Sequence, residues 1–509
     1  MLNHLGQVAQ QAAQKFGDKE ALLFNGQGFT FAELADMVER VAASLVAAGV
    51  KHGDVVTLYA DNSWKWIVSY YAIARAGAVI NPVNTMLTPE EIRYVVDDCG
   101  AKVIIASEDK VAGANAVLDR VLAAFTFGED APDGMETFDQ LLNGGAPVIP
   151  EIDVQPEDLS TICYTSGTTG HPKGAMQSHR SVILNAALTA QTQNRGASDI
   201  MVSALPCPHV YATVIMQVMM LYGAKLVLHE RFDPKAALED IERQKATLID
   251  GVPTMYMYLL NETDLDSTDL SSLTRAFVGG QTMPVATMET VEKNFGVPLT
   301  ELWGMTEIAG LGSTHPHDGD VKYGSIGCAL PDCELRIADP EDPDRALPRR
   351  EVGELQVKGP ITMMGYFGAE QKTKETLLES GWLRTGDLGH MDEDGYVFIV
   401  DRLKDMILTG GFNVYPAEIE RVLAEHPDIV LAAVGRKKDE VKGEVAKAYI
   451  VLKEGATTDK EAINAFCRKR LSAYKCPRSI QFVSDLPTTS TGKIMRRELH
   501  TLDEVNESR

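Results

Sequence analysis

Apolar and polar positions along residues 1–400 predict helices interleaved with short strands. Residues 30–33 read Thr-Phe-Ala-Glu, which is a capping box, and the apolar positions 34, 37, 38, 41 and 45 then fall on one helical face. A second helix is expected at 64–75, and short apolar strands at 55–58, 103–105, 225–228, 247–250 and 275–278. Such alternation predicts an α/β fold with largely parallel sheets.

The pattern changes twice toward the end of the chain. Between about residues 324 and 400, β-branched and alternating runs lie between Gly and Pro signals, which predicts a small β-rich unit. After the charged run 401–405, Pro416 marks a first helical turn, and we expect helices at 417–426 and 460–471 with strands at 429–434, 446–452 and 480–483. We therefore predict two domains, residues 1–402 and a compact α+β unit of residues 403–509.

Composition and charge exclude several classes of protein. The 509 residues are 45% apolar and 24% charged, as in ordinary globular proteins of several structural units. Lys and Arg number 48 against 72 Asp and Glu, and this net charge of -24 argues against a nucleic-acid binder. The seven cysteines form no C-x-x-C pair. The most apolar stretch, around residues 214–228, is interrupted by Gln217, Gly223 and Lys225 and is therefore not expected to span a membrane. With no signal-peptide pattern at the N-terminus, we expect free thiols, no integral membrane segment and a cytoplasmic location.

Residues 164–174 (Tyr-Thr-Ser-Gly-Thr-Thr-Gly-His-Pro-Lys-Gly) are the most informative stretch. Glycines let backbone amides close around an anion, four hydroxyls lie within five residues, and a lysine adds positive charge. The string is neither a Walker A loop nor a Rossmann fingerprint. It predicts a cradle for nucleotide phosphates, against the alternative of a solvated surface loop. The cradle would consist of Thr165, Ser166, Gly167, Thr168, Thr169, Gly170 and Lys173.

Four shorter motifs follow. They are Gly-Gly-Gln at 279–281, Leu-Trp-Gly-Met-Thr-Glu at 302–307, Arg-Thr-Gly-Asp at 384–387 and Thr-Gly-Lys-Ile at 491–494. Paired glycines let backbone approach a base closely, a carboxylate can accept two ribose hydroxyls, and Mg²⁺ needs few carboxylates beside phosphate oxygens and waters. Taken singly, each motif has an ordinary alternative: a turn, a helix cap, an exposed loop or a surface lysine.

In this order, the motifs resemble the signatures of the adenylate-forming (ANL) superfamily, which holds acyl-CoA synthetases, peptide-synthetase adenylation domains and firefly-type luciferases. The resemblance covers essentially the whole chain. It implies a large N-terminal domain of two α/β lobes plus a distorted β-barrel, with a small mobile α+β C-terminal domain that rotates between half-reactions. It also implies ATP, Mg²⁺ and coenzyme A as cofactor and co-substrates, and a homodimer is common among such proteins.

The resemblance also implies roles for individual residues. Lys493 would be the mobile catalytic lysine, Thr306 would contact the α-phosphate, and Glu307 would hold Mg²⁺. Asp387 would hold the ribose hydroxyls, Arg402 would reach the ribose or a phosphate, and Lys404 would lie at the hinge. Trp303, where the family more often has tyrosine, would cover the adenine, and His209 would line the acyl pocket beside Ala212, where relatives often have glycine. Further nucleotide or coenzyme A contacts are expected at Gly279, Gly280, Gln281, Gly304, Met305, Gly410 and Gly411.

The implied function is an AMP-forming acyl-CoA synthetase, which activates a carboxylic acid with ATP and transfers the acyl group to coenzyme A. No charged residue stands out in the expected pocket segments, so we expect an apolar acid, either a medium- or long-chain fatty acid or an aryl or phenylpropenoic acid. One alternative passes the acyl group to an amine or a carrier-protein thiol. Another is a non-catalytic nucleotide-binding protein, against which the retention of Glu307, Asp387 and Lys493 argues.

Overall fold

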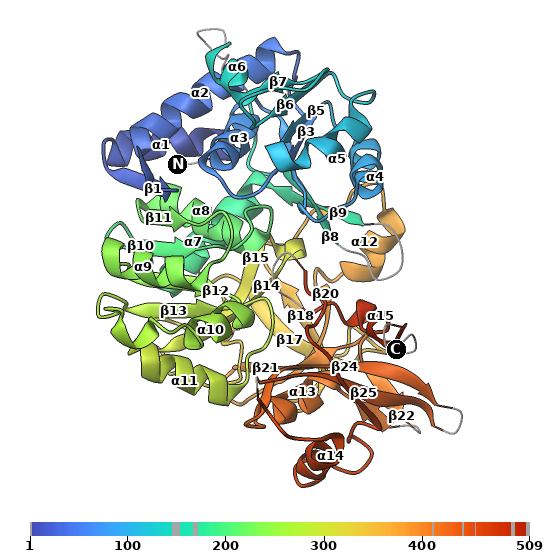
Figure 1. Cartoon of the computed structure of the whole chain (residues 1–509). Coiled ribbons are helices and arrows are strands. Elements are labelled where there is room, and N and C mark those ends of the chain that lie inside the picture. Colours follow the sequence, from blue (N-terminus) through green and yellow to red (C-terminus); the bar gives the residue numbers. More distant parts are fainter. Residues whose placement is uncertain are drawn as a thin grey trace.

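The chain forms two α/β lobes, a small antiparallel sheet and a C-terminal α+β unit (Figure 1). The structure, a computed structural model, describes residues 3–144, 153–165, 172–409, 412–439, 442–453, 455–489 and 494–504. The predicted α/β class, with a large N-terminal part and a small C-terminal one, is confirmed. Figure 1 shows the C-terminal unit, in orange to red, beside the antiparallel sheet and away from the N-terminal lobe.

The first lobe contains an eight-stranded sheet in the order β19-β9-β8-β4-β3-β5-β6-β7. Strand pairs from β4 through β7 are parallel, whereas β8–β9 and β9–β19 are antiparallel. Both faces are covered, because Val56 and Leu58 pack in one core with α2 and α3 while Val55 and Tyr59 pack in another with α4. The strands are β3 (Val55–Tyr59), β4 (Val79–Pro82), β5 (Val103–Ala106), β6 (Ala123–Thr126), β7 (Glu136–Thr137), β8 (Leu159–Thr165), β9 (Lys173–Ser178) and β19 (Gly365–Tyr366).

Two helices of this lobe begin where the sequence predicts. Thr30 and Glu33 form the expected capping box at the start of α2. The helix expected at 64–75 is α3, which Ser63 caps. The helices are α1 (Val8–Phe16), α2 (Phe31–Ala47), α3 (Trp64–Arg75), α4 (Pro89–Cys99), α5 (Val111–Ala114) and α6 (Phe138–Asn143).

The second lobe contains a nine-stranded sheet in the order β16-β15-β14-β13-β12-β10-β11-β1-β2. Its central strands are parallel, and β2, β15 and β16 add antiparallel edges. The strands are β1 (Glu20–Phe24), β2 (Gln27–Thr30), β10 (Ile200–Ser203), β11 (Lys225–Leu228), β12 (Leu248–Gly251), β13 (Arg275–Val278), β14 (Leu299–Met305), β15 (Gly310–Thr314) and β16 (Cys328–Ala329). The helices are α7 (His179–Thr192), α8 (Val210–Tyr222), α9 (Pro234–Gln244), α10 (Pro253–Leu260) and α11 (Val285–Phe295).

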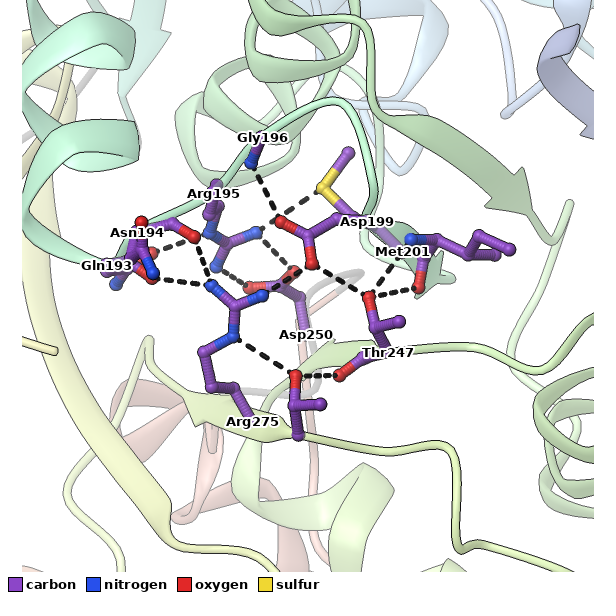
Figure 2. Close-up of polar contacts among 11 residues, drawn as sticks. Gln193, Asn194, Arg195, Gly196, Asp199, Met201, Thr247, Asp250 and Arg275 are labelled. Atoms are coloured by element: carbon purple, nitrogen blue, oxygen red, sulfur yellow. Dashed lines mark hydrogen bonds and ion pairs between the residues drawn. The ribbon is translucent and has the colours of Figure 1, made fainter.

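A buried network of charges ties the central strands of this sheet together (Figure 2). Arg195, which is 1% exposed, donates two hydrogen bonds to Asp250 on β12, which is 0% exposed, at 2.6 and 2.7 Å. Arg275 at the start of β13 pairs with Asp199 just before β10, and Asp199 also accepts a hydrogen bond from Thr247. The network therefore joins segments that lie far apart in the sequence.

The antiparallel sheet β17-β18-β20-β21 is the β-rich unit expected between residues 324 and 400. Its strands are β17 (Glu334–Ala338), β18 (Gly353–Lys358), β20 (Leu383–Met391) and β21 (Val397–Arg402), and α12 (Glu370–Thr376) precedes β20. The strand β21 ends at Arg402, and the next strand belongs to a different sheet.

The C-terminal unit has a five-stranded sheet with two principal helices. Its elements are β22 (Ile407–Thr409), β23 (Phe412–Val414), α13 (Pro416–Ala424), β24 (Ile429–Asp439), β25 (Gly443–Leu452), α14 (Lys460–Arg468), β26 (Ser479–Phe482) and α15 (Thr501–Glu504). The strand β24 extends beyond the predicted end at 434, because its pairing with β25 continues to Asp439 opposite Gly443. Those added positions include exposed lysines, so the apolar pattern gave no sign of them.

Two expectations from composition also have a structural counterpart. All seven cysteines are free, and five of them are buried. Among the residues that the structure describes, none of the helices combines the length and apolarity that crossing a membrane requires. The apolar stretch of the sequence divides into α8 and β11, and Gly223, the C-cap of α8, has a left-handed conformation.

Candidate active site

The predicted phosphate cradle connects two paired strands. Thr165 ends β8 and Lys173 begins β9, and the two residues lie opposite each other in the antiparallel ladder. Five predicted members of the cradle, Ser166, Gly167, Thr168, Thr169 and Gly170, lie outside the described residues. The side-chain nitrogen of Lys173 lies 5.4 Å from the centre of the Tyr366 ring, a cation–π contact. The ladder therefore holds Thr165 and Lys173, the two described members of the predicted cradle, side by side.

Glu307 is held by a tyrosine that sequence reasoning missed. The strand β14 runs into the short 3-10 turn η5 (Thr306–Ile308), which contains Glu307. The hydroxyl of Tyr366 donates to Glu307 Oε1 at 2.8 Å. Burial, and then the charge of Glu307, raise the pKa of Tyr366, so it remains a donor. Tyr366 thus contacts both Lys173 and Glu307, and only the pairing of β19 with β9 brings it there.

The donor set around Glu307 fits Mg²⁺. Within the described part of the chain, no group of three or more His, Cys, Asp or Glu side chains could enclose a metal ion. Mg²⁺ is commonly bound by one or two carboxylates together with substrate phosphates and waters. The hydroxyl of Tyr366 engages one oxygen of Glu307 and orients the carboxylate. Glu307 is therefore suited to hold Mg²⁺ jointly with a nucleotide.

Asp387 lies at the centre of a second polar cluster. It stands on β20 directly opposite Arg402 on β21. Arg402 Nε lies 3.0 Å from Asp387 Oδ1, and Trp303 Nε1 donates to Asp387 Oδ2 at 2.8 Å. The charge of Asp387 is the main reason that the pKa of Arg402 is raised, and Glu307 contributes to the same effect. Two of the predicted motifs, 302–307 and 384–387, therefore meet at Asp387 together with Arg402 from the charged run 401–405.

The glycines of the predicted adenine loop allow close packing beside Trp303. A Cβ on Gly279 would lie 2.3 Å from Leu302 Cδ1, and one on Gly304 would lie 2.1 Å from the carbonyl oxygen of Gly310. Gly280 has a φ of 87°, which favours glycine. Gln281 and Met305 flank these glycines in the same two segments. The structure thus places 279–281 against 302–305, as a shared nucleotide site requires.

A buried carboxylate, Glu301, lies on β14 two residues before Trp303. Its Oε1 accepts a hydrogen bond from the amide of Met283 at 3.1 Å, which ties the end of the 279–283 loop to the strand. Burial raises the pKa of Glu301 to about 7, although the Met283 amide and the charge of Arg421 act in the opposite direction. Glu301 was not predicted as a site residue.

His209 and the helix that follows it form the segment in which the acyl pocket is expected. His209 is the N-cap of α8, and its Nδ1 accepts a hydrogen bond from the amide of Tyr211 at 3.3 Å. Ala212 is buried in the first turn of the same helix. The hydroxyl of Tyr211 donates to Asp250 Oδ1 at 3.0 Å. Asp250 is thus a charged residue in an expected pocket segment, but Arg195 and Tyr211 engage both of its oxygens.

The described residues that follow the predicted catalytic lysine are anchored near Arg402. Lys493, together with Gly410 and Gly411, lies outside the described residues. Three positions after Lys493, Arg496 forms ion pairs with Asp401 at 3.6 Å, Asp405 at 3.1 Å and Glu420 at 2.6 Å. Lys404 is exposed and lies in the connection between β21 and β22. The C-terminal segment therefore contacts the junction of the two sheets next to the Asp387–Arg402 pair.

Two family models and several known proteins match this chain. The family model described as "AMP-binding enzyme" matches residues 9–367, and that of the "AMP-binding enzyme C-terminal domain" matches residues 418–493. A long-chain-fatty-acid–CoA ligase of Bacillus subtilis is 34% identical, over 99% of this chain and 95% of the relative. A feruloyl-CoA synthase of Amycolatopsis is 35% identical, over 97% and 98%. ATP-bound MatB from Rhodopseudomonas palustris superposes with a TM-score of 0.90 at 33% identity, over 99% of both chains.

The chain therefore belongs to the AMP-binding enzyme family, the adenylate-forming superfamily whose motifs it carries. Within that family, its relatives place it in the acyl-CoA synthetase branch.

Proposed function

We propose that this protein is an AMP-forming acid–thiol ligase that activates an apolar carboxylic acid with ATP and transfers the acyl group to coenzyme A. The convergence of Trp303, Asp387, Arg402 and Glu307, from three separate segments, is the observation that carries the proposal. These groups supply an aromatic face, a ribose acceptor, a cation and a metal-binding carboxylate in one place. An acyl-adenylate reaction needs each of them.

In the first half-reaction, the substrate carboxylate attacks the α-phosphorus of ATP, and pyrophosphate leaves. The loop between Thr165 and Lys173 would hold the departing phosphates, and Thr306 would contact the α-phosphate. Glu307 would hold Mg²⁺, which neutralises charge on the phosphates when bound. Lys493 would bridge the attacking carboxylate and the α-phosphate as negative charge develops.

In the second half-reaction, the thiol of coenzyme A attacks the acyl-adenylate carbonyl and AMP leaves. We propose that residues 403–509 rotate about Lys404, which withdraws Lys493 and brings Gly410 and Gly411 forward to form the thiol tunnel. One site with two chemically different steps requires two arrangements, which a hinged domain provides. The connection between β21 and β22, in which Lys404 is exposed, is a suitable place for such a hinge.

The decisive assay is acid-dependent ATP–pyrophosphate exchange across a panel of fatty, aryl and phenylpropenoic acids, with and without coenzyme A. Lys493→Ala should abolish exchange but spare thioester formation from a supplied acyl-adenylate. Lys453→Ala, an exposed lysine in the same domain, is the matched control and should retain both. Equal loss of both half-reactions in Lys493→Ala would contradict the proposed role.

The same panel separates the alternative acceptors. Adenylate formation without acyl-CoA product would favour transfer to an amine or a carrier-protein thiol, and no pyrophosphate release with any acid would favour a non-catalytic nucleotide binder. The relatives named fatty-acid ligase and feruloyl-CoA synthase support both acid classes in the panel. We further propose a cytoplasmic location, which the seven free thiols support.

A further inference from the structure

We propose that Trp303 is a positioning residue for the ribose of ATP, and that it acts through the hydrogen bond from its indole N–H to Asp387. This inference rests on the proposed function, in which Asp387 accepts the ribose hydroxyls. It goes beyond that function because it gives the tryptophan a role that a tyrosine or phenylalanine ring stacked on adenine would not have. It makes Trp303 a determinant of sugar recognition.

The two oxygens of Asp387 are held from different sides. Trp303 Nε1 donates to Oδ2 at 2.8 Å, and Arg402 Nε lies 3.0 Å from Oδ1. The amide of Asp387 also donates to Thr385 Oγ1 at 3.0 Å, which fixes the backbone. An ionised carboxylate offers about four lone-pair sites. One site on each oxygen is therefore used internally, and one on each remains for the two neighbouring hydroxyls of a ribose.

The hydrogen bond is buried on both sides. Trp303 is 8% exposed and Asp387 is 6% exposed. A hydrogen bond to a charged acceptor is stronger where water is excluded, and the loss of one partner leaves the other unsatisfied. If Trp303 could not donate, Oδ2 would lose its direct protein donor, and Asp387 could turn about its side-chain torsions. The remaining lone pairs would then no longer point to fixed positions.

A β-bulge at Gly312, in the strand next to Trp303, fixes the position of the indole ring. The strands β14 and β15 pair Trp303 with Ser313 and Gly304 with Leu311, so Gly312 is an extra residue in β15 opposite Trp303. A Cβ on Gly312 would lie 2.5 Å from Trp303 Cζ3 and 2.9 Å from Cε3. The six-membered ring therefore occupies the space that this glycine leaves, and the five-membered ring points its N–H at Asp387. The bulge sets the direction of the donor.

The test compares Trp303→Phe with the parent protein by equilibrium binding of ATP, 2′-deoxy-ATP and 3′-deoxy-ATP. Phenylalanine keeps an aromatic face but has no N–H. We expect the preference for ATP over each deoxynucleotide to fall by about tenfold, the effect of losing one buried hydrogen bond to a charged group. Trp382→Phe, a partly exposed tryptophan packed on Arg336, is the matched control and should leave the preference unchanged.

A thermodynamic cycle with Asp387→Asn locates the effect. If Trp303 acts through Asp387, adding Trp303→Phe to Asp387→Asn should change the preference no further. Equal losses for all three nucleotides in Trp303→Phe would overturn the inference, because that result would assign Trp303 to stacking or packing alone. An additive effect in the double variant would overturn it as well.

The inference can still be tested if the variant does not fold or if the proposed enzyme function is wrong. If Trp303→Phe does not fold, Trp303→Phe with Gly312→Ala tests the same hydrogen bond. The added methyl fills space that the indole leaves, once the end of the Ile308 side chain, 2.7 Å from the added Cβ, turns aside. Binding of the three nucleotides needs neither acid nor coenzyme A, so it tests the inference even if no acid supports pyrophosphate exchange. Parent protein that binds ATP and both deoxynucleotides equally would overturn the inference outright.

Discussion

Replacing Glu301 with glutamine should change how the stability of this protein depends on pH. Glu301 is 3% exposed on β14, and its Oε1 accepts the amide of Met283. Burial raises its pKa from 4.5 to about 7. Glutamine keeps an oxygen acceptor for Met283 and stays neutral at every pH of interest. The substitution therefore removes the titration with little change in shape.

The contribution of Glu301 to the free energy of unfolding depends on how tightly the folded and unfolded chains bind its proton. The folded protein holds the proton of Glu301 more tightly than the unfolded chain, so stability from this group is present below pH 4.5 and lost as pH rises through about 7. The pKa of Glu301 rises from 4.5 in the unfolded chain to about 7 in the folded protein. At about 1.4 kcal/mol for each pH unit, this rise changes the free energy of unfolding by about 3 kcal/mol in total. Between pH 5 and pH 8, Glu301→Gln should therefore gain about 2–3 kcal/mol relative to the parent protein.

Urea unfolding at pH 5 and pH 8, followed by tryptophan fluorescence, measures this gain. Both proteins are compared in the same buffers, so that the other titrating groups cancel. Glu289→Gln on α11 is the matched control, since that carboxylate is exposed and its replacement should give a similar small offset at both pH values. An offset for Glu301→Gln that is the same at pH 5 and pH 8 would refute the reasoning.

Three further substitutions test other parts of the site. Arg195→Met should lower stability by about 3–5 kcal/mol, because it leaves Asp250 buried without its ion-pair partner. Adding Asp250→Leu should recover most of this loss, measured by thermal unfolding. Additive losses in the double variant would argue against a stabilising pair. Tyr366→Phe should raise the Mg²⁺ concentration for half-maximal pyrophosphate exchange about 10-fold or more, because Glu307 loses its orienting donor; an unchanged Mg²⁺ dependence would exclude that role. Lys404→Pro should impair thioester formation more than adenylate formation in separate assays of the two half-reactions, and an unchanged ratio would reject the hinge.

The sequence predicted the locally determined part of the fold well. The capping box at Thr30 and Glu33 joins side chains and amides three residues apart, so the pattern contains all that the structure needs. Short apolar strands between helices predicted parallel sheets, and the register confirms them. The end of β24 was missed, because its last residues are held by pairing with β25 and not by burial of apolar side chains.

The sequence by itself also determined which residue types a nucleotide site would need, because the chemistry of glycines, hydroxyls and carboxylates depends on short motifs. Only the tertiary structure decided which side chains meet. Tyr366 reaches Glu307, 59 positions away, and Trp303 reaches Asp387, 84 positions away. Such contacts depend on strand order, on register and on the bulge at Gly312, which no local pattern specifies. Short motifs therefore indicate which chemical groups a site contains, whereas the pairing of strands far apart in the sequence sets how those groups are arranged.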